Sequence, residues 1–418
     1  MKKSAVSLVC TIMLLLSGCS VEGPLPSISP SLDPEYKANQ SFETIVPYET
    51  DSSFELAFTD ATILDVSEIT LQEGSLENFF SGEKSHYIAY DDNGGILFRN
   101  YDDFIIKNVN LSTGEVSEVM DISTNSDRYM MVFCYGGNWL VWAESKDEAL
   151  YVGSSIGEGW AVFAANLVTK EIIKIDEENE FFPNDRTFFA LPLDMSCNGN
   201  MVAFSGYEAD ADGVRKALKV YDLSERSLST IATIDADDSK AFTGPSVCDT
   251  HIVYGISQMK DLTITNNSIY SYNLETFVLS EIDNSGDFIF TTASEQYIVA
   301  TKPWSEDYQD TSLVIYDILN ESWIFAIDEY SPIYRSFHEV GVGLSDAQIC
   351  GDYVAWRSIH NTFLYIYSVK DNTFYKIMDS DEGLFTGYIL YFVNNLFAWA
   401  GGSINDTNEG YYKFVLLE

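Results

Sequence analysis

The residues best suited to chemistry are few, and most lack the partners that their chemistry needs. The segment 208–213 places oxygen ligands at alternate positions before a glycine, which is the pattern of a calcium-binding loop. Glu208, Asp210 and Asp212 are therefore the candidate calcium ligands, although lysines stand where further ligands would be needed. The simpler interpretation is a solvated acidic hairpin between two strands, and on that interpretation the protein needs no cofactor.

Nucleophilic and zinc chemistry have weaker support. The sequence around Ser155 reads G-x-S-x-G, but a nucleophile elbow requires a strand followed by a helix, and no helix is expected there. The histidines form no closely spaced pair and no H-E-x-x-H motif, so the sequence indicates no zinc enzyme. We interpret all four as turn or structural residues: His86, His251, His338 and His360.

Aromatic residues supply the remaining candidate. Trp304 and Tyr308 lie in a loop that follows a predicted strand, and exposed aromatic side chains are frequent binding residues. Trp142, Trp356 and Trp399 instead end predicted strands, so we expect them in the core. No catalytic residue can be chosen from 64 acidic side chains without geometry.

The N-terminus has the pattern of an export signal. Lys2 and Lys3 precede an apolar run that is too short to span a membrane. The run ends in Leu-Ser-Gly-Cys at Cys19, which resembles the signal of bacterial lipoproteins. This resemblance implies that residues 1–18 are a signal peptide and that Cys19 carries the lipid, which would anchor the protein to a bacterial membrane. The alternatives are an ordinary signal peptide and an uncleaved anchor.

Residues 19–53 hold half of the ten prolines together with many serines and acids, so we expect a flexible tether. The whole chain of 418 residues carries 64 acidic and 23 basic side chains, a formal charge of −41. Such a charge argues against nucleic acid as a partner, because phosphate binding requires a basic surface. It also argues against charge-driven docking on anionic lipid, so membrane contact is expected through the N-terminal lipid alone.

Residues 54–418 repeat. A short apolar strand recurs seven times, on average about every 51 residues, and its central residues are Ile88, Val141, Val202, Val253, Val299, Val354 and Phe397. A second strand follows each of the first six copies and ends in a polar and then an aliphatic residue, as in Asp222-Leu223. Four short strands per repeat predict an all-β fold, a seven-bladed β-propeller of four-stranded antiparallel blades. Six and eight blades are the alternatives.

The last repeat lacks a fourth strand, and an unpaired edge is a liability. The surplus N-terminal run 61–69 is therefore predicted to pair into the last blade and close the ring. Four cysteines remain after export, and we expect them to be buried thiols, with a disulfide as the alternative: Cys134, Cys197, Cys248 and Cys350. The last three are predicted to occupy matching positions, at the end of the first strand of a blade.

The pattern resembles the secreted bacterial propellers of the TolB-like and WD-repeat-like type. The N-terminal signal predicts an extracytoplasmic location, and a propeller can vary its loops while its strands hold the ring, so we expect these loops to bind a partner at the cell envelope. We expect that partner to be a protein, or else a glycan, and the propeller to be a monomer without catalytic activity. The alternative is an extracellular polymer-degrading enzyme, a polysaccharide lyase or glycosidase, whose active site gathers single residues from several blades.

Overall fold

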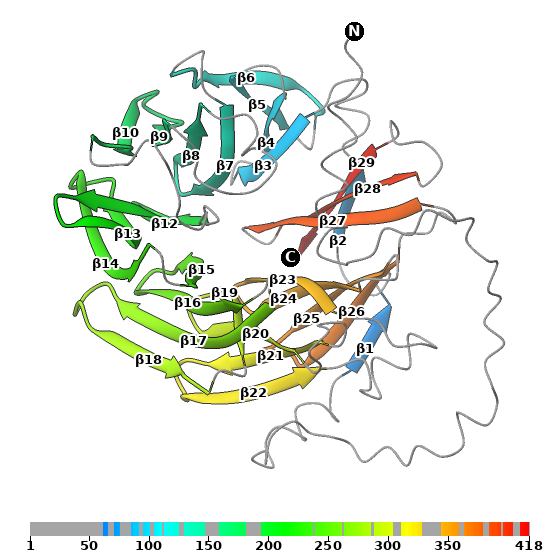
Figure 1. Ribbon diagram of the computed structural model, residues 1–418. Helices are drawn as coiled ribbons and strands as arrows, with labels where there is room; N and C mark the ends of the chain where they lie inside the picture. The colour runs from blue at the N-terminus through cyan, green and yellow to red at the C-terminus, as the bar shows by residue number, and fades with distance from the viewer. Residues whose placement is uncertain are drawn as a thin grey trace, which may run out of the picture.

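The computed structural model is all-β wherever it describes the chain (Figure 1). It describes residues 62–65, 71–75, 85–91, 95–100, 104–110, 113–124, 129–146, 159–180, 194–236, 239–260, 263–285, 288–303, 311–327, 344–358, 363–378, 384–393, 396–403 and 410–417. Within these segments there is no helix that is long and apolar enough to cross a membrane.

The described strands pair into seven sheets, each containing one copy of the sequence repeat. The first three sheets along the chain have simple antiparallel order. They are β3 (Ser85–Asp91), β4 (Gly95–Asn100), β5 (Ile105–Asn110) and β6 (Val116–Asp121); β7 (Tyr129–Gly136), β8 (Trp139–Ser145), β9 (Ala161–Asn166) and β10 (Ile172–Glu177); and β11 (Met195–Asn198), β12 (Met201–Asp210), β13 (Gly213–Asp222) and β14 (Ser227–Asp235).

The next two sheets have the same order, and the last two each take up an N-terminal strand. They are β15 (Lys240–Val247), β16 (His251–Lys260), β17 (Thr263–Asn273) and β18 (Leu279–Asp283); β19 (Ile289–Ala293), β20 (Tyr297–Pro303), β21 (Thr311–Asp317) and β22 (Ser322–Ile327); β23 (Leu344–Cys350), β24 (Tyr353–Ser358), β25 (Phe363–Ser368), β26 (Thr373–Met378) and β1 (Thr62–Asp65); and β27 (Leu384–Val393), β28 (Leu396–Ser403), β29 (Gly410–Leu417) and β2 (Leu71–Ser75).

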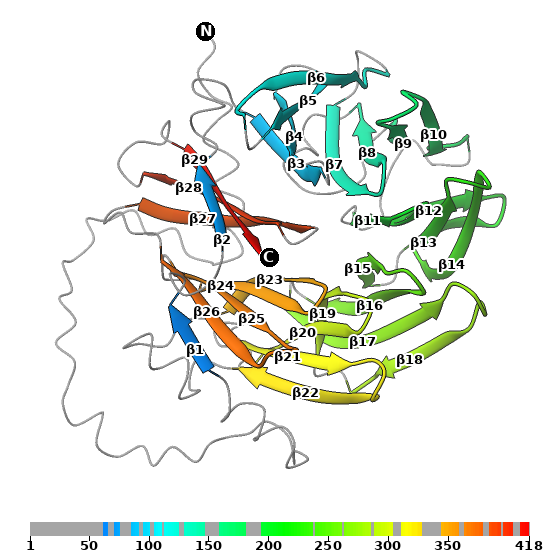
Figure 2. The same cartoon turned by 180° about the vertical axis from the view of Figure 1, so that it is seen from behind.

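The sheets stand around a common centre (Figures 1 and 2). The first strand of each sheet is innermost and contacts the first strand of the next, from β3 through β7, β11, β15, β19 and β23 to β27, which contacts β3 again. The prediction of a β-propeller with four-stranded antiparallel blades is therefore confirmed. We refer to each blade by its strands, as in the β15–β18 blade.

The ring is closed by a different N-terminal segment from the predicted one. The run 61–69 was expected to complete the last blade. Instead β2, at Leu71–Ser75, pairs antiparallel with β29 and supplies the missing strand. Strand β1, inside the predicted run, pairs parallel with β26 as a fifth strand of the neighbouring blade. An edge strand of either blade offers unpaired backbone groups, so apolar patterning alone does not select between the two positions.

The polar and aliphatic residues that recur together in the repeat, as in Asp222-Leu223, lie at the turn between the third and fourth strands of a blade. Each makes hydrogen bonds that shape the turns of that blade. The polar side chain accepts hydrogen bonds from backbone N–H groups two and three residues later, as Asn166, Asp222 and Asn273 do. The N–H of the aliphatic residue donates to the turn between the first and second strands, as Leu223 does to Asn200 and Leu274 to Thr250. The two turns of a blade are thereby held together on one side of the ring, which we call the turn face.

Two details of the predicted register are wrong. The repeat residue Ile88 lies in the innermost strand β3, whereas its counterparts in the other copies lie in second strands. Cys248 and Cys350 do match, because each immediately precedes a two-residue turn and pairs across it with His251 and Tyr353 respectively. Cys197 lies one residue earlier in the register, since Asn198 occupies that turn position.

The core lies between neighbouring blades as well as within each one. Apolar residues of the β7–β10 and β11–β14 blades form one buried cluster that includes Val141, Val202 and Phe204. The same interface holds an ion pair, Lys219 Nζ to Asp176 Oδ2 at 2.5 Å, with both side chains largely buried. Packing between sheets therefore fixes how the blades, and the turns that they carry, sit relative to one another.

Candidate functional site

A cluster of polar side chains joins three consecutive blades on the turn face. It is built on two equivalent turns. In the β15–β18 blade, the N–H of Cys248 donates to the carbonyl of His251 at 2.9 Å, so Asp249 and Thr250 form a two-residue turn. In the β19–β22 blade, the N–H of Ser294 donates to Tyr297 at 2.8 Å, which closes the same turn one blade further on. Side chains at the two closing positions of such a turn lie on the same side of the hairpin.

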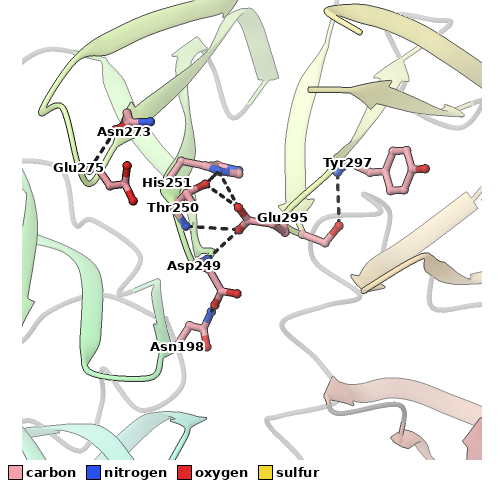
Figure 3. Close-up of polar contacts among 9 residues, drawn as sticks. Asn198, Asp249, Thr250, His251, Asn273, Glu275, Glu295 and Tyr297 are labelled. Atoms are coloured by element: carbon pink, nitrogen blue, oxygen red, sulfur yellow. Dashed lines mark hydrogen bonds and ion pairs between the residues drawn. The ribbon is translucent and has the colours of Figure 1, made fainter. Parts of the chain in front are cut away.

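Glu295 connects the two turns (Figure 3). One carboxylate oxygen accepts from the N–H of Asp249 at 2.8 Å and from the N–H of Thr250 at 3.4 Å. The other accepts from the Thr250 hydroxyl at 2.5 Å and lies 4.0 Å from Nδ1 of His251. These contacts hold the carboxylate over the turn of the preceding blade.

The cluster extends to a third blade through Asp249. Its Oδ1 accepts a hydrogen bond from Nδ2 of Asn198, in the β11–β14 blade, at 2.8 Å (Figure 3). Neighbouring turns are therefore held together by polar side chains, in addition to the apolar core beneath them.

Two of the side chains at this site are buried. Cys248 is 5% exposed and His251 is 6% exposed. Burial raises the pKa of the Cys248 thiol to about 12, and the carboxylates of Glu295 and Asp249 contribute to this shift. Burial also lowers the pKa of His251, and the Glu295 carboxylate and the nearby backbone of Ser294 oppose that shift. At neutral pH the site therefore holds a protonated thiol and a neutral imidazole beside the exposed Glu295 side chain.

Cys248, His251 and Glu295 together could hold a metal ion. One ligand atom of each lies within 4.8 Å of those of the other two. Sequence reasoning interpreted His251 as a turn residue and Cys248 as a buried hydrophobe, and it did not single out Glu295. The sequence shows the Cys-x-x-His spacing of Cys248 and His251. It does not show that Glu295, in the next repeat, lies beside them, because that contact depends on how the turns of the two blades are placed.

An apolar segment lies on the same face of the same blade. Phe277, Val278 and Leu279 are consecutive exposed residues, and Phe277 is 73% exposed. Phe277 also has a φ of 57°, a backbone conformation that bulky side chains rarely adopt. The corresponding turn residue elsewhere is Gly114, Lys170, Arg226, Glu321 or Asn372, so only this blade places an aromatic side chain there among the described turns. Leu319, in the next blade, is 75% exposed.

The predicted calcium ligands lie at the hairpin between β12 and β13. The expectation of an acidic hairpin at this place is confirmed. Asp210 Oδ2 pairs with the Arg215 guanidinium at 2.7 Å, and Glu208 lies 4.0 Å from the same group. Asp212 is at the exposed tip. The Arg215 guanidinium therefore supplies the positive charge beside Glu208 and Asp210, in the place where a calcium ion would bind them.

Several other candidates fall outside the described residues. These are Cys19, Ser155, Trp304, Tyr308, His338 and His360. His86 lies in β3. The tether and the signal segment likewise lie in the part of the chain that the structure leaves undescribed.

One carboxyl group that sequence reasoning missed lies at the inner part of the ring. Asp194 precedes the innermost strand β11, and its N–H donates to the Ser205 hydroxyl at 3.0 Å. Burial raises the pKa of its side chain to about 6, and a hydrogen bond from the backbone of Gly244, in the neighbouring innermost strand β15, opposes the rise. Nothing in the local sequence distinguishes Asp194 from the other acids.

Cys134 and Cys197 also meet across blades. They belong to the innermost strands β7 and β11, and both pack against the same buried cluster. Burial raises the pKa of Cys134 well above its usual value, and an interaction with the Cys197 thiol adds to the rise. All four cysteines of the described residues are free thiols, as expected, but only Cys248 is fully buried. The sequence did not indicate that Cys134 lies near Cys197.

No protein-family model matches the chain, and no curated protein matches it. Solved structures do resemble it. A prolyl endopeptidase has a TM-score of 0.54 and 8% identity, with 81% of this chain and 50% of that chain covered, so this chain spans about half its length. The β-propeller domain of the Trilobed protease from Pyrococcus furiosus has a TM-score of 0.52 and 11% identity, covering 79% and 93%. TolB from Acinetobacter baumannii is also among the matches, with a TM-score of 0.38 and 12% identity, covering 70% and 62%. At such identities the likeness shows the fold, a β-propeller, and nothing of the activity.

Proposed function

We propose that the protein is a lipid-anchored, extracytoplasmic β-propeller that binds a protein partner at the cell envelope and is not an enzyme. The N-terminal pattern ending at Cys19 and the acidic tether support the location. On this proposal the acyl group holds the chain to the membrane, and the tether of residues 19–53 lets the propeller reach its partner.

The observation that carries the binding proposal is the apolar segment Phe277–Leu279. An aromatic residue at a φ of 57° destabilises the folded state, and its 73% exposure means that it gains little from burial in return. Asn372 occupies the equivalent position in another blade with a φ of 51° and carries a side chain that tolerates this conformation. A side chain that is unfavourable for folding is best explained by a contact made outside the fold, and aromatic side chains are frequent anchors of protein interfaces.

The alternative is an extracellular polymer-degrading enzyme, a polysaccharide lyase or glycosidase. The observation in its favour is Asp194, because a carboxyl group with a pKa of about 6 is suited to proton transfer near neutral pH. It lies between two innermost strands, and propeller enzymes can gather catalytic groups from several blades.

The two proposals are separated by one paired experiment on the purified full chain. The chain is screened for turnover of polysaccharides, and in parallel it is immobilised to capture proteins of the cell envelope. We expect no turnover, and we expect one protein to be retained by the wild type and lost by the variant Phe277→Asn, Val278→Thr. The matched control is Val168→Thr, at an exposed turn residue of the β7–β10 blade. Turnover that Asp194→Asn abolishes would instead establish the enzyme.

A further inference from the structure

The turn between β15 and β16 presents two metal-binding side chains in a fixed relation. Cys248 and His251 close a two-residue turn, so their side chains project from the same side of the hairpin. Both are buried; the backbone of His251 is paired within the sheet, and that of Cys248 is held by its hydrogen bond to His251. A Cys-x-x-His turn therefore supplies a sulfur and an imidazole nitrogen with little conformational freedom left to lose on binding an ion.

The third group comes from the next blade. Glu295 brings a carboxylate so that the three ligand atoms lie within 4.8 Å of one another. In a tetrahedral zinc site, bond lengths of about 2.0–2.3 Å place the ligand atoms roughly 3.5 Å apart. The observed 4.0 Å between His251 Nδ1 and Glu295 Oε1 is close to that value. Glu295 is exposed, and the small movement that remains would exchange the hydrogen bond from the Thr250 hydroxyl to Oε1 for the bond to the ion.

Hydrogen bonds within the fold occupy part of this cluster. The Glu295 oxygens accept from Asp249 and Thr250, and Nδ1 of His251, the ring nitrogen near Glu295, lies 3.1 Å from the Thr250 hydroxyl. An ion bound between Nδ1 and the Glu295 carboxylate would take the place of that hydroxyl. The second ring nitrogen, Nε2, is buried and has no hydrogen-bond partner among the described residues, so the fold satisfies the imidazole only in part.

We propose that Cys248, His251 and Glu295 bind one Zn²⁺ ion on the turn face, between the β15–β18 and β19–β22 blades. Thiolate, imidazole and carboxylate are the ligands that zinc takes, whereas calcium and magnesium prefer oxygen alone. Three protein ligands leave one coordination position open, and the exposed Glu295 places that position at the surface. A water molecule, or a donor atom of a bound partner, completes the tetrahedron.

Local charge favours the ion. Asp249 lies beside the cluster, and the side chain that donates to its carboxylate is the neutral Asn198, so the negative charge of Asp249 is not cancelled by that contact. Coordination removes the proton of the Cys248 thiol to solvent, since the thiolate is the ligand. The resulting pair of anions, thiolate and carboxylate, then balances the dication.

Cobalt provides the direct probe, because Co²⁺ replaces Zn²⁺ in tetrahedral sites and absorbs through its bond to a thiolate. The full chain is purified, freed of metal with a chelator and titrated with Co²⁺ and then Zn²⁺. We expect one equivalent of Co²⁺ to produce thiolate charge-transfer absorption, Zn²⁺ to abolish that absorption, and Zn²⁺ to raise the melting temperature of the metal-free protein.

Variants assign the ligands. Cys248→Ser should remove the thiolate absorption. Glu295→Gln should weaken zinc binding by more than about tenfold, because loss of a residue that only supports a metal ligand already lowers metal affinity by about that factor. The matched control is Cys350→Ser, because Cys350 occupies the same turn position in another blade but faces Tyr353 in place of a histidine. It should bind Co²⁺ as the wild type does.

The proposal is overturned if Co²⁺ gives no thiolate absorption in the wild type, or if Cys248→Ser keeps it. Should Cys248→Ser fail to fold, the exposed Glu295→Gln decides the matter, and unchanged affinity there also rejects the site. The readouts do not depend on any partner, so the result is independent of the proposed binding function.

Discussion

Replacement of Asp194 by asparagine should stabilise the propeller at neutral pH. The pKa of this carboxyl rises from 3.8 to about 6 because burial disfavours its charged form. A native state with the higher pKa binds the proton more tightly than the unfolded chain does. The contribution of Asp194 to stability is therefore greatest below pH 3.8 and declines as the pH rises through 6.

The size of the effect follows from the shift. About two pKa units correspond to roughly 3 kcal/mol, which is an upper limit because the side chain keeps part of its surface in water. The amide oxygen introduced by Asp194→Asn retains an acceptor for the Gly244 backbone without carrying charge.

The assay is chemical denaturation of the wild type and of Asp194→Asn at several pH values between about 3.5 and 8, which bracket the two pKa values of about 4 and 6. The two proteins should be similar near pH 4, and the variant should become more stable as the pH rises. Asp212→Asn, at an exposed hairpin tip, is the control and should follow the wild type. Parallel stability curves for Asp194→Asn and the wild type across this range would refute the reasoning.

Three further predictions test the fold. Lys219→Met leaves the buried Asp176 without its partner and should lower the free energy of unfolding by about 3–5 kcal/mol, measured by denaturation; a change below about 1 kcal/mol would contradict the structural role of the pair. Phe277→Asn should raise stability by about 1 kcal/mol in the same assay, and a loss would show that Phe277 packs within the fold. A chain starting at residue 76 lacks β2 and should melt at a lower temperature than one starting at residue 67, which lacks only β1; equal melting would mean that β2 does not close the ring.

The repeat was readable from the sequence because its signals are local. The polar-aliphatic pair, as in Asn273-Leu274, is required by one turn within one blade, so it recurs in each of the first six repeats. Alternating apolar residues mark each strand for the same reason. Closure by β2 was not readable, because both β1 and β2 are short and their positions depend on which distant edge, β26 or β29, accepts them.

The metal-binding cluster illustrates the same limit for sites. Cys248 and His251 are three residues apart, but a cysteine and a histidine alone do not make a zinc site, which needs at least a third protein ligand. Glu295 is supplied by the packing of one blade against the next, and it is one of 64 acids in the chain. Asp194 was hidden in the same way, since its pKa depends on how two innermost strands bury it.

The central claim, that the propeller binds a protein through the segment Phe277–Leu279, is tested most directly by cross-linking in cells. A photo-reactive amino acid is placed at position 277 of the full chain, and at position 168 in a matched control. The account predicts a covalent adduct with one envelope or secreted protein from position 277 and none with that protein from position 168. No adduct from position 277, or the same adducts from both positions, would contradict it.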